Sequence, residues 1–490
     1  MTRKKLWTSA MFVVCFVGNM LMGGPLRAVN PWERWDSVLS SSQPRTPFQA
    51  YHDVQVEATF WLKSGSACTE PATCTNPNSC FKGLAFWDGD ATTPGRFMIR
   101  SAFPPSGTPG ASSTWCWKTC LLPRSGSACS PDAGLNKSGE VPVSGSGTNA
   151  LYSNGFPKAP AGKRNPTAWN GQTPFQWLGD TAWIAPINYG LSQANRNLWR
   201  DYVTARAASY VGNSFAGGGG FTNVLVAPAV QTQQNPPSGG FRGFVTPQSC
   251  GTGTGPVVPA NCHYWDSAYW RDFDAMVRAA NDAGILLVVV DVMDPLNRAG
   301  TNQPISPAVK FPTRADAAVF ARNFAARLAG SFVIFSPSFD ARVGDPTAES
   351  GVTVAGLIDA VGTAIRSAAP RHLIGVHLAG GSALSDYDQF QGKPWLSLQV
   401  FQSGHGSAAC EGGLSDDYAK FACRARDFAL RFRCINETVA SLPSCASSGA
   451  PAGLPKPAVN VEGKYETIGD SLTRVQSRHV GWNGGLSGSF

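Results

Sequence analysis

From about residue 175 onward, short apolar runs alternate with longer amphipathic segments. The amphipathic segments, among them Tyr269–Ala283, Arg314–Leu328 and Val354–Ala368, carry apolar residues at three- and four-residue spacing. Such an alternation predicts parallel strands joined by crossover helices. The seven candidate strands are Phe175–Leu178, Thr222–Ala227, Ile285–Val292, Phe332–Ser336, Leu373–His377, Leu396–Phe401 and Ala458–Val461. We therefore expect an α/β fold, a (β/α)8 barrel of the TIM type.

The last part of this barrel is expected to be missing. An eighth strand should follow the helical segment near Ser471–His479, but the sequence stops at Phe490 in a Gly- and Ser-rich stretch. The sequence thus predicts a barrel that is truncated before its last strand and helix.

The first 150 residues have a different pattern. Short alternating stretches such as Val54–Trp61 and Gly95–Arg100 are separated by Gly, Ser, Pro and Cys, which is typical of an antiparallel β-sandwich. The stretch Ser125–Ala161 is rich in Ser, Gly and Pro, so it should contain the domain boundary. We expect a β-sandwich domain at residues 29–149 and the barrel at residues 150–490.

Residues 1–28 have the order of a secretory signal peptide. A basic start is followed by the apolar run Leu6–Met22 and by small residues up to Ala28. The protein is therefore expected to be secreted or periplasmic, without stable membrane association after cleavage. An uncleaved membrane anchor is the alternative, since the apolar run is almost long enough to span a bilayer.

Charge and cysteine content fit this prediction. Four of the positive charges behind the net charge of +8 lie in the first 28 residues, and the remaining +4 argues against a nucleic-acid partner. Of 13 cysteines, all but Cys15 lie beyond the signal, in even local groups of six, two and four, which favours disulfides. Zinc is the alternative, but paired CxxC spacing is absent. We expect no metal, no cofactor and a monomer.

Two carboxylates stand out at the ends of candidate strands, where barrel enzymes carry their reactive groups. Asp340 follows the fourth candidate strand and Glu462 follows the seventh. Glycoside hydrolysis needs two carboxyl groups, one of which protonates the leaving oxygen while the other attacks the anomeric carbon or activates water. The alternatives are structural: Asp340 could cap a turn, and Glu462 could pair with Lys464 or Arg474.

Three ordered motifs, Trp177–Trp183, Gln402–His405 and Pro457–Glu466, resemble the apiosidase-like barrel family, which includes glycoside hydrolase family 140. The stretches Ala50–Phe60 and Ala85–Gly89 resemble the β-sandwich domain of unknown function that often precedes such barrels.

The resemblance implies a retaining, exo-acting glycosidase that acts on polysaccharide side chains, with Asp340 as acid/base and Glu462 as nucleophile. Around Asp340 the chain departs from the family pattern, because Phe339 stands where the family usually has glycine.

Further side chains near the same strand ends are candidates for sugar binding. They are Asp180, Trp183, His377, Gln402, Ser403, His405 and Tyr465. Asp180 would accept a hydrogen bond on the floor of the sugar subsite, and Trp183 would stack there, unless it is a core aromatic. His377 and His405 would contact sugar hydroxyls or the nucleophile, unless each is structural. A noncatalytic carbohydrate-binding or adhesion protein on a degenerate barrel remains the alternative function.

Overall fold

The structure is a computed structural model of the 490-residue chain. It describes residues 28–74, 76–105, 112–122, 129–159, 167, 175, 177–183, 185–208, 220–228, 244–245, 264–290, 313–347, 349–379, 382, 384–402 and 456–462. Within these residues no helix is both long enough and apolar enough to cross a membrane.

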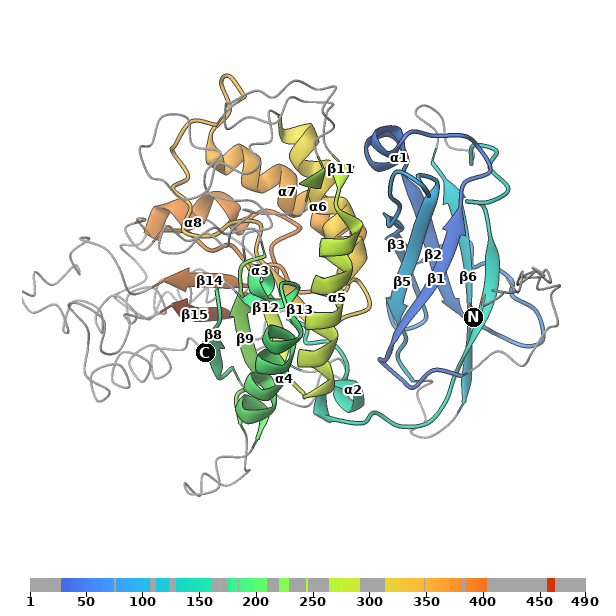
Figure 1. Cartoon of the computed structure of the whole chain (residues 1–490), viewed down its shortest axis with the longest axis horizontal. Helices are drawn as coiled ribbons and strands as arrows, with labels where there is room; N and C mark the ends of the chain where they lie inside the picture. Colours follow the sequence, from blue (N-terminus) through green and yellow to red (C-terminus); the bar gives the residue numbers. More distant parts are fainter. Residues whose placement is uncertain are drawn as a thin grey trace, which may run out of the picture.

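The N-terminal part, residues 28–143, consists of two antiparallel sheets and one short helix (Figure 1). One sheet has the order β1-β5-β4 and the other has the order β3-β2-β6-β7. The elements are β1 (Arg34–Ser40), α1 (Pro47–Asp53), β2 (Val56–Leu62), β3 (Cys80–Leu84), β4 (Phe86–Trp87), β5 (Arg96–Ala102), β6 (Ser113–Leu121) and β7 (Ser138–Val143). We call this part the N-terminal β region.

Aromatic side chains fill the space between the two sheets. Trp35 of β1 meets Phe60 of β2 at a ring-centroid distance of 6.4 Å and Trp117 of β6 at 5.7 Å. Three disulfides, Cys68–Cys116, Cys74–Cys80 and Cys120–Cys129, tie this region together. They use all six of its cysteines and confirm the disulfide prediction there. The other six cysteines of the predicted set lie outside the described residues.

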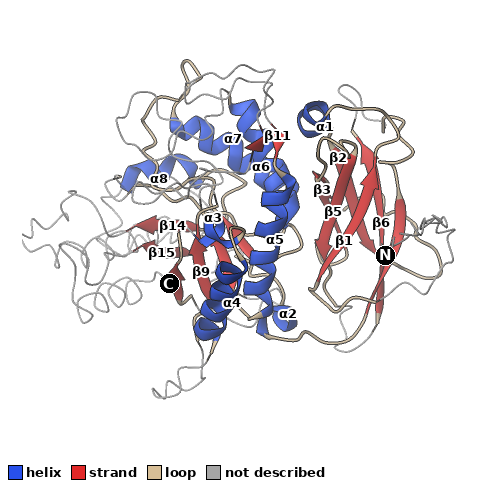
Figure 2. Cartoon of the chain, in the orientation of Figure 1, coloured by secondary structure: helices blue, strands red, loops and turns tan. Residues whose placement is uncertain are grey.

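The second part alternates strands and helices (Figure 2). Its elements are α2 (Ala150–Asn154), β8 (Gly179–Thr181), α3 (Ala185–Tyr189), α4 (Gln193–Ala207), β9 (Asn223–Val226), β10 (Phe244–Val245), β11 (Tyr264–Trp265), α5 (Ser267–Asp282), β12 (Leu286–Val289), α6 (Arg314–Leu328), β13 (Val333–Phe335), α7 (Val354–Ala368), α8 (Leu384–Gln391), β14 (Gln399–Gln402) and β15 (Ala458–Glu462). Helix α5 is capped by Asp266, whose carboxylate accepts hydrogen bonds from the amides of Ala268 and Tyr269.

Parallel pairing runs through this part. Strands β13, β12, β9 and β8 form one sheet in that order, and β14 pairs with β15. The segment Leu373–Leu378 connects them through single parallel bridges, Phe335 to Ile374 on one side and His377 to Val400 on the other. Seven parallel segments therefore follow one another, which is the wall of an α/β barrel. The end of the chain, where the sequence predicted that the eighth strand is missing, lies outside the described residues.

One predicted strand was placed wrongly. Pairing with β9 begins at Gly179, whereas the sequence pattern predicted a strand at Phe175–Leu178. Phe175 and Trp177 are apolar because they pack on the interior cluster, not because they belong to the strand. At Gly179 an added Cβ would lie 2.2 Å from Asn223 Oδ1, so a larger residue there would displace the Asn223 side chain.

Side chains alternate between two apolar clusters along each strand. Val224, Leu287, Val333 and Val376 belong to the large cluster that includes the helices α5, α6 and α7. Their neighbours along the strands belong to a second cluster, which fills the interior of the barrel. This second cluster includes Leu225, Leu286, Val288, Ile334, Leu373, Val400 and Val459. The alternation therefore identifies which strand residues face the barrel interior.

The N-terminal β region packs against α5 and α6 through a buried network of charges. Arg327 of α6 binds Asp88 at 2.6 Å and Asp274 of α5 at 3.1 Å. Arg100 of β5 binds the same Asp274 at 2.9 Å and Asp36 of β1 at 2.7 Å. The guanidinium groups of Arg327 and Arg100 each lie between two carboxylates. The network therefore joins the N-terminal β region to α5 and α6 with both buried cations compensated.

A second contact joins the two parts beside this network. Arg371 precedes the Leu373–Leu378 segment and is buried beneath Phe81 of β3, with its guanidinium 3.7 Å from the ring centroid. Its Nη2 donates hydrogen bonds to Ser101 Oγ (3.0 Å) and to the carbonyl oxygen of Ala102 (2.7 Å). Arg371, which belongs to the barrel part, is therefore packed into the N-terminal β region.

Candidate active site

The loop after β13 carries Asp340 and is fixed by two serines. Ser336 Oγ donates to the carbonyl oxygen of Ser338 at 2.7 Å and accepts the amide of His377 at 3.1 Å. Ser338 Oγ donates to the carbonyl oxygen of His377 at 2.9 Å. Both serines are buried. The sequence prediction did not include them, although the Ser-Pro-Ser run directly after an apolar strand is a visible signal.

Asp340 has a left-handed backbone, with φ of 47°. Few residues other than glycine adopt this conformation, and aspartate is among those that tolerate it best. Its amide donates to Nδ1 of His377 at 3.1 Å, and its side chain is half-buried at the carboxyl end of the strands. Directly after this loop, Ala341 forms a parallel bridge with Leu378 of the neighbouring Leu373–Leu378 segment.

His377 is fully buried and faces the barrel interior, since the outward-facing residues of its segment are Ile374, Val376 and Leu378. Because Nδ1 accepts the Asp340 amide, this nitrogen carries no proton, and the ring is the tautomer protonated at Nε2. The contact of His377 with a sugar hydroxyl or the nucleophile stays a prediction. The contact that the structure does provide is to the main chain of Asp340.

Three rings lie in contact at this end of the barrel. Phe339 lies between Trp183 (centroids 4.4 Å apart, planes at 45°) and His377 (5.1 Å, 35°). Trp183 and Phe339 are both half-buried and both pack on the interior cluster. Trp183 therefore serves the barrel core and also reaches the candidate site. The large ring of Phe339 bridges the first and fourth strand ends, which glycine at that position could not do.

Gln402 and Glu462 are the last residues of the neighbouring strands β14 and β15. Their backbones pair with each other, after a register shift that begins beyond the Phe401–Asn460 pair. The side chain of Gln402 is buried, and its Oε1 has no hydrogen-bond partner among the described residues. Because His377 bridges to Val400 of β14, Asp340, His377, Gln402 and Glu462 lie on successive neighbouring segments at one edge of the barrel.

Asp180 is located elsewhere. It pairs in register with the outward-facing Val224, and its Oδ2 accepts the hydroxyl of Tyr202 at 2.9 Å and contacts Arg206 Nε of α4 at 2.5 Å. Its Oδ1 accepts the amide of Thr181 at 2.8 Å. This carboxylate faces the helix layer, so the geometry does not support the expected role on the floor of a sugar subsite.

Three predicted residues lie outside the described part of the chain: Ser403, His405 and Tyr465. At Glu462 the structure describes the main chain.

Metal-ligand residue types come together at one place in the described residues. Cys68, Cys116 and Glu140 have ligand atoms within 4.8 Å of one another. The two cysteines form a disulfide, however, so no thiolate is available there to bind a metal.

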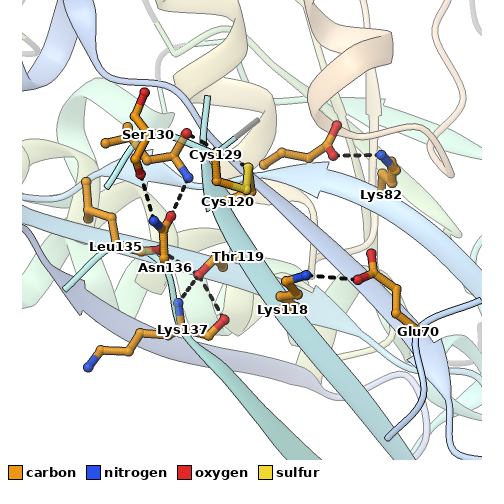
Figure 3. Close-up of a disulfide and its surroundings, with 12 residues drawn as sticks. Glu70, Lys82, Lys118, Thr119, Cys120, Cys129, Ser130, Leu135, Asn136 and Lys137 are labelled. Carbon is orange, nitrogen blue, oxygen red and sulfur yellow. Dashed lines mark hydrogen bonds and ion pairs between the residues drawn. A yellow bond between two sulfur atoms is a disulfide. The ribbon is translucent and has the colours of Figure 1, made fainter. Parts of the chain in front are cut away.

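A cleft of about 400 Å³ lies beside this disulfide in the N-terminal β region. It is lined by Trp61, Cys68, Glu70, Trp117, Lys118, Ser138, Gly139 and Glu140. Its carboxylates have cationic partners: Glu70 pairs with Lys118 at 3.1 Å, as Figure 3 shows, and Glu140 pairs with Lys63 at 2.7 Å. The cleft therefore lacks the two cooperating carboxyl groups of a hydrolase, and the barrel edge remains the candidate active site.

Comparisons with known proteins identify the family of the barrel part. The family described as "Apiosidase-like, catalytic domain" matches residues 169–490, about two thirds of the chain. No curated protein matches this sequence.

Among solved structures, the chain resembles a protein from Bacteroides vulgatus ATCC 8482 that is proposed to be a glycoside hydrolase. The TM-score is 0.58 at 14% identity, over 94% of this chain and 70% of that one, which supports a common fold. A glycoside hydrolase family 5 protein from the same organism gives a TM-score of 0.43 at 18% identity, over 70% of this chain and 63% of that one. A score this low does not establish a common fold.

Proposed function

The chain belongs to the apiosidase-like catalytic domain family and is therefore a glycoside hydrolase, and from this premise we propose how and where it acts. It is a secreted, exo-acting, retaining enzyme that cleaves glycosidic bonds in polysaccharide side chains. Asp340 is the acid/base and Glu462 the nucleophile. The observation that supports this assignment is that both follow or end parallel segments at the same edge of the barrel, with His377 and Gln402 between them.

In the proposed mechanism, Asp340 protonates the oxygen of the leaving group while Glu462 attacks the anomeric carbon. The resulting covalent glycosyl-enzyme is then hydrolysed by a water that Asp340, now ionised, deprotonates. Retention requires the two carboxyl groups to lie about 5 to 5.5 Å apart. Gln402, with a buried amide oxygen in the interior, is proposed to accept a hydrogen bond from a sugar hydroxyl. Trp183, Ser403, His405 and Tyr465 complete the proposed sugar site.

The wider organisation is part of the same proposal. Residues 1–28 are a cleaved signal peptide, residues 29–149 a β-sandwich domain and residues 150–490 a (β/α)8 barrel, and the protein is a monomer. The three disulfides and the two antiparallel sheets of the N-terminal β region support export and a sandwich, respectively.

Substitution of each carboxylate tests the assignment. The wild-type protein is incubated with a panel of plant and microbial polysaccharides, and released sugar is identified by chromatography. Glu462→Gln should reduce release to background, and Asp340→Asn should lower kcat/KM by about 10²- to 10⁴-fold, because each removes a group that acts on the reacting atoms. Unchanged activity in either variant would remove that residue from the mechanism.

Asp180→Asn is the matched control, since this carboxylate also lies on a barrel strand but faces α4. It should retain wild-type kcat/KM. Proton NMR of the first product anomer decides between retention and inversion. Binding of a polysaccharide in affinity electrophoresis without release of any sugar would instead indicate a noncatalytic carbohydrate-binding protein.

A further inference from the structure

We propose that His377 is a positioning residue for Asp340: its Nδ1 holds the main-chain amide of Asp340 and thereby aims the carboxyl group. This rests on the proposed role of Asp340 as acid/base. It differs from the sequence-based expectation for His377, which was a contact between this histidine and a sugar hydroxyl or the nucleophile.

Asp340 has a backbone conformation that is unusual for a residue other than glycine. A left-handed backbone at a residue other than glycine costs energy and persists when its surroundings fix it. The hydrogen bond from the Asp340 amide to His377 Nδ1, at 3.1 Å, is a direct constraint on that backbone. Since φ sets where the Cα–Cβ bond points, the constraint also limits the positions that the carboxyl group can reach.

His377 is itself held by the same loop, twice through its main chain and once through its ring. Ser336 Oγ accepts the amide of His377, Ser338 Oγ donates to its carbonyl oxygen, and Phe339 covers its ring. All three of these residues belong to the loop that ends in Asp340. The loop and the histidine therefore fix each other, and a small shift of one moves the other.

The contact between the two segments extends beyond the loop. Ala341, next to Asp340, bridges to Leu378, next to His377, and the carbonyl oxygen of Ala341 accepts the amide of Ala379 at 2.9 Å. The two segments therefore pair again on the far side of Asp340. The left-handed turn at Asp340 interrupts this bridging, and there His377 Nδ1, in place of a main-chain oxygen, accepts the Asp340 amide.

The two ring nitrogens give different predictions for substitution. The side-chain oxygen of asparagine lies as many bonds from Cα as Nδ1 does, whereas the amide group of glutamine reaches the position of Nε2. His377→Asn can thus still accept the Asp340 amide, and His377→Gln cannot. If His377 instead acted on the substrate through Nε2, glutamine would be the better replacement.

The experiment measures kcat and KM of both variants on the natural polysaccharide. His377→Gln should lower kcat by about 10²-fold at unchanged KM, as expected for a misplaced catalytic group, while His377→Asn should lose only several-fold. The same variants are then assayed on the 2,4-dinitrophenyl glycoside of the sugar that the wild-type enzyme releases. This leaving group departs without protonation, so the loss in kcat/KM for His377→Gln should largely disappear.

Three results would overturn the proposal: a higher activity of His377→Gln than of His377→Asn, equal losses in both, or a loss that is the same on both substrates. If neither variant folds by circular dichroism, Ser338→Ala replaces them, because it removes the hydrogen bond to the His377 carbonyl and should show the same dependence on leaving group. Asp340→Asn distinguishes a failure of the positioning role of His377 from a failure of the acid/base role of Asp340. If this variant keeps wild-type activity, the proposed function of Asp340 has failed, whatever the histidine variants show.

Discussion

Two regions hold an aspartate in opposite ways. At the interface between the N-terminal β region and the helices, the Asp88 carboxylate contacts the guanidinium groups of Arg327, Arg271 and Arg96. At the barrel edge, Asp340 is fixed through its main chain, by the hydrogen bond to His377 and a left-handed backbone. The Asp88 carboxylate, bound by three guanidinium groups, stabilises the structure, whereas the contact to His377 fixes the main chain of Asp340. The two aspartates thus differ in the atoms through which these contacts are made, which are carboxylate oxygens in Asp88 and the main-chain amide in Asp340.

The largest expected effect is at the interface. Asp88→Ala should lower the free energy of unfolding by about 3 to 5 kcal/mol, because it leaves the fully buried Arg327 with an uncompensated part of its charge. Urea unfolding followed by circular dichroism measures this loss, and kcat of the folded fraction should stay unchanged. Asp340→Asn should do the opposite, with a large loss of kcat and an unfolding free energy within about 0.5 kcal/mol of wild type. If both substitutions affected stability alike, the distinction would be lost.

Acid should weaken the protein in two stages, and the first involves His372. Burial lowers the pKa of His372 to about 3, and its Nδ1 has no hydrogen-bond partner among the described residues. The unfolded chain binds a proton near pH 6.5 that the folded chain excludes, so stability falls as the pH drops from about 6.5 toward 3, by up to a few kcal/mol.

Urea midpoints between pH 7.5 and 4.5 test this stage. His372→Gln, whose amide can still donate to the Ser331 carbonyl as the ring does at 2.9 Å, should flatten the curve. An unchanged slope in this variant would exclude His372 as its cause.

The second stage lies at lower pH. Burial alone would raise the pKa of Asp88, but the adjacent Arg327 and Arg271 outweigh it and hold that pKa below its ordinary value. In Asp36, likewise, Arg100 and Arg34 outweigh burial and lower the pKa. A lowered folded pKa contributes stability that is complete above about pH 4 and is lost as the pH falls through the folded value. The Asp88→Ala variant should therefore have a shallower decline below pH 4 than the wild type, as measured by urea midpoints.

The smallest effect is expected at an exposed ion pair. Lys118 and Glu70 lie 3.1 Å apart, with side chains that are 53% and 40% exposed (Figure 3). Such pairs are screened by water and salt, so Lys118→Ala should not change the urea midpoint measurably. A clear loss would show that the distance between the charges, and not their burial, determines what an ion pair contributes here.

The sequence predicted elements well where local signals agree. The helices α6 and α7 have the predicted bounds, because amphipathic spacing there begins directly after a threonine at the N-cap. The strand at β8 was misplaced because the aromatic residues before it are apolar for packing and not for pairing. An apolar run alone does not distinguish these two causes.

The site was less predictable, for a physical reason. The position of Asp340 after a strand was visible in the sequence, but the contact to His377 depends on a left-handed turn and on lateral bridging between segments 37 residues apart. Asp180 shows the same limitation, since the side of the sheet that it faces follows from its register with β9 and from Arg206 at the end of α4. Side-chain direction at strand ends is set by long-range pairing, which residue spacing does not encode.

The buried position of Arg371 has a consequence for modularity. Its guanidinium hydrogen-bonds to β5 and lies beneath Phe81, and the large apolar cluster contains residues of both parts of the molecule. The N-terminal β region is therefore not an exchangeable attachment. Separated from it, the barrel would expose the Arg371 guanidinium and an apolar helix surface that the N-terminal β region now covers. The two parts should melt in a single cooperative transition, and a graft of this β region onto another barrel would need a matching arginine to fill the same place.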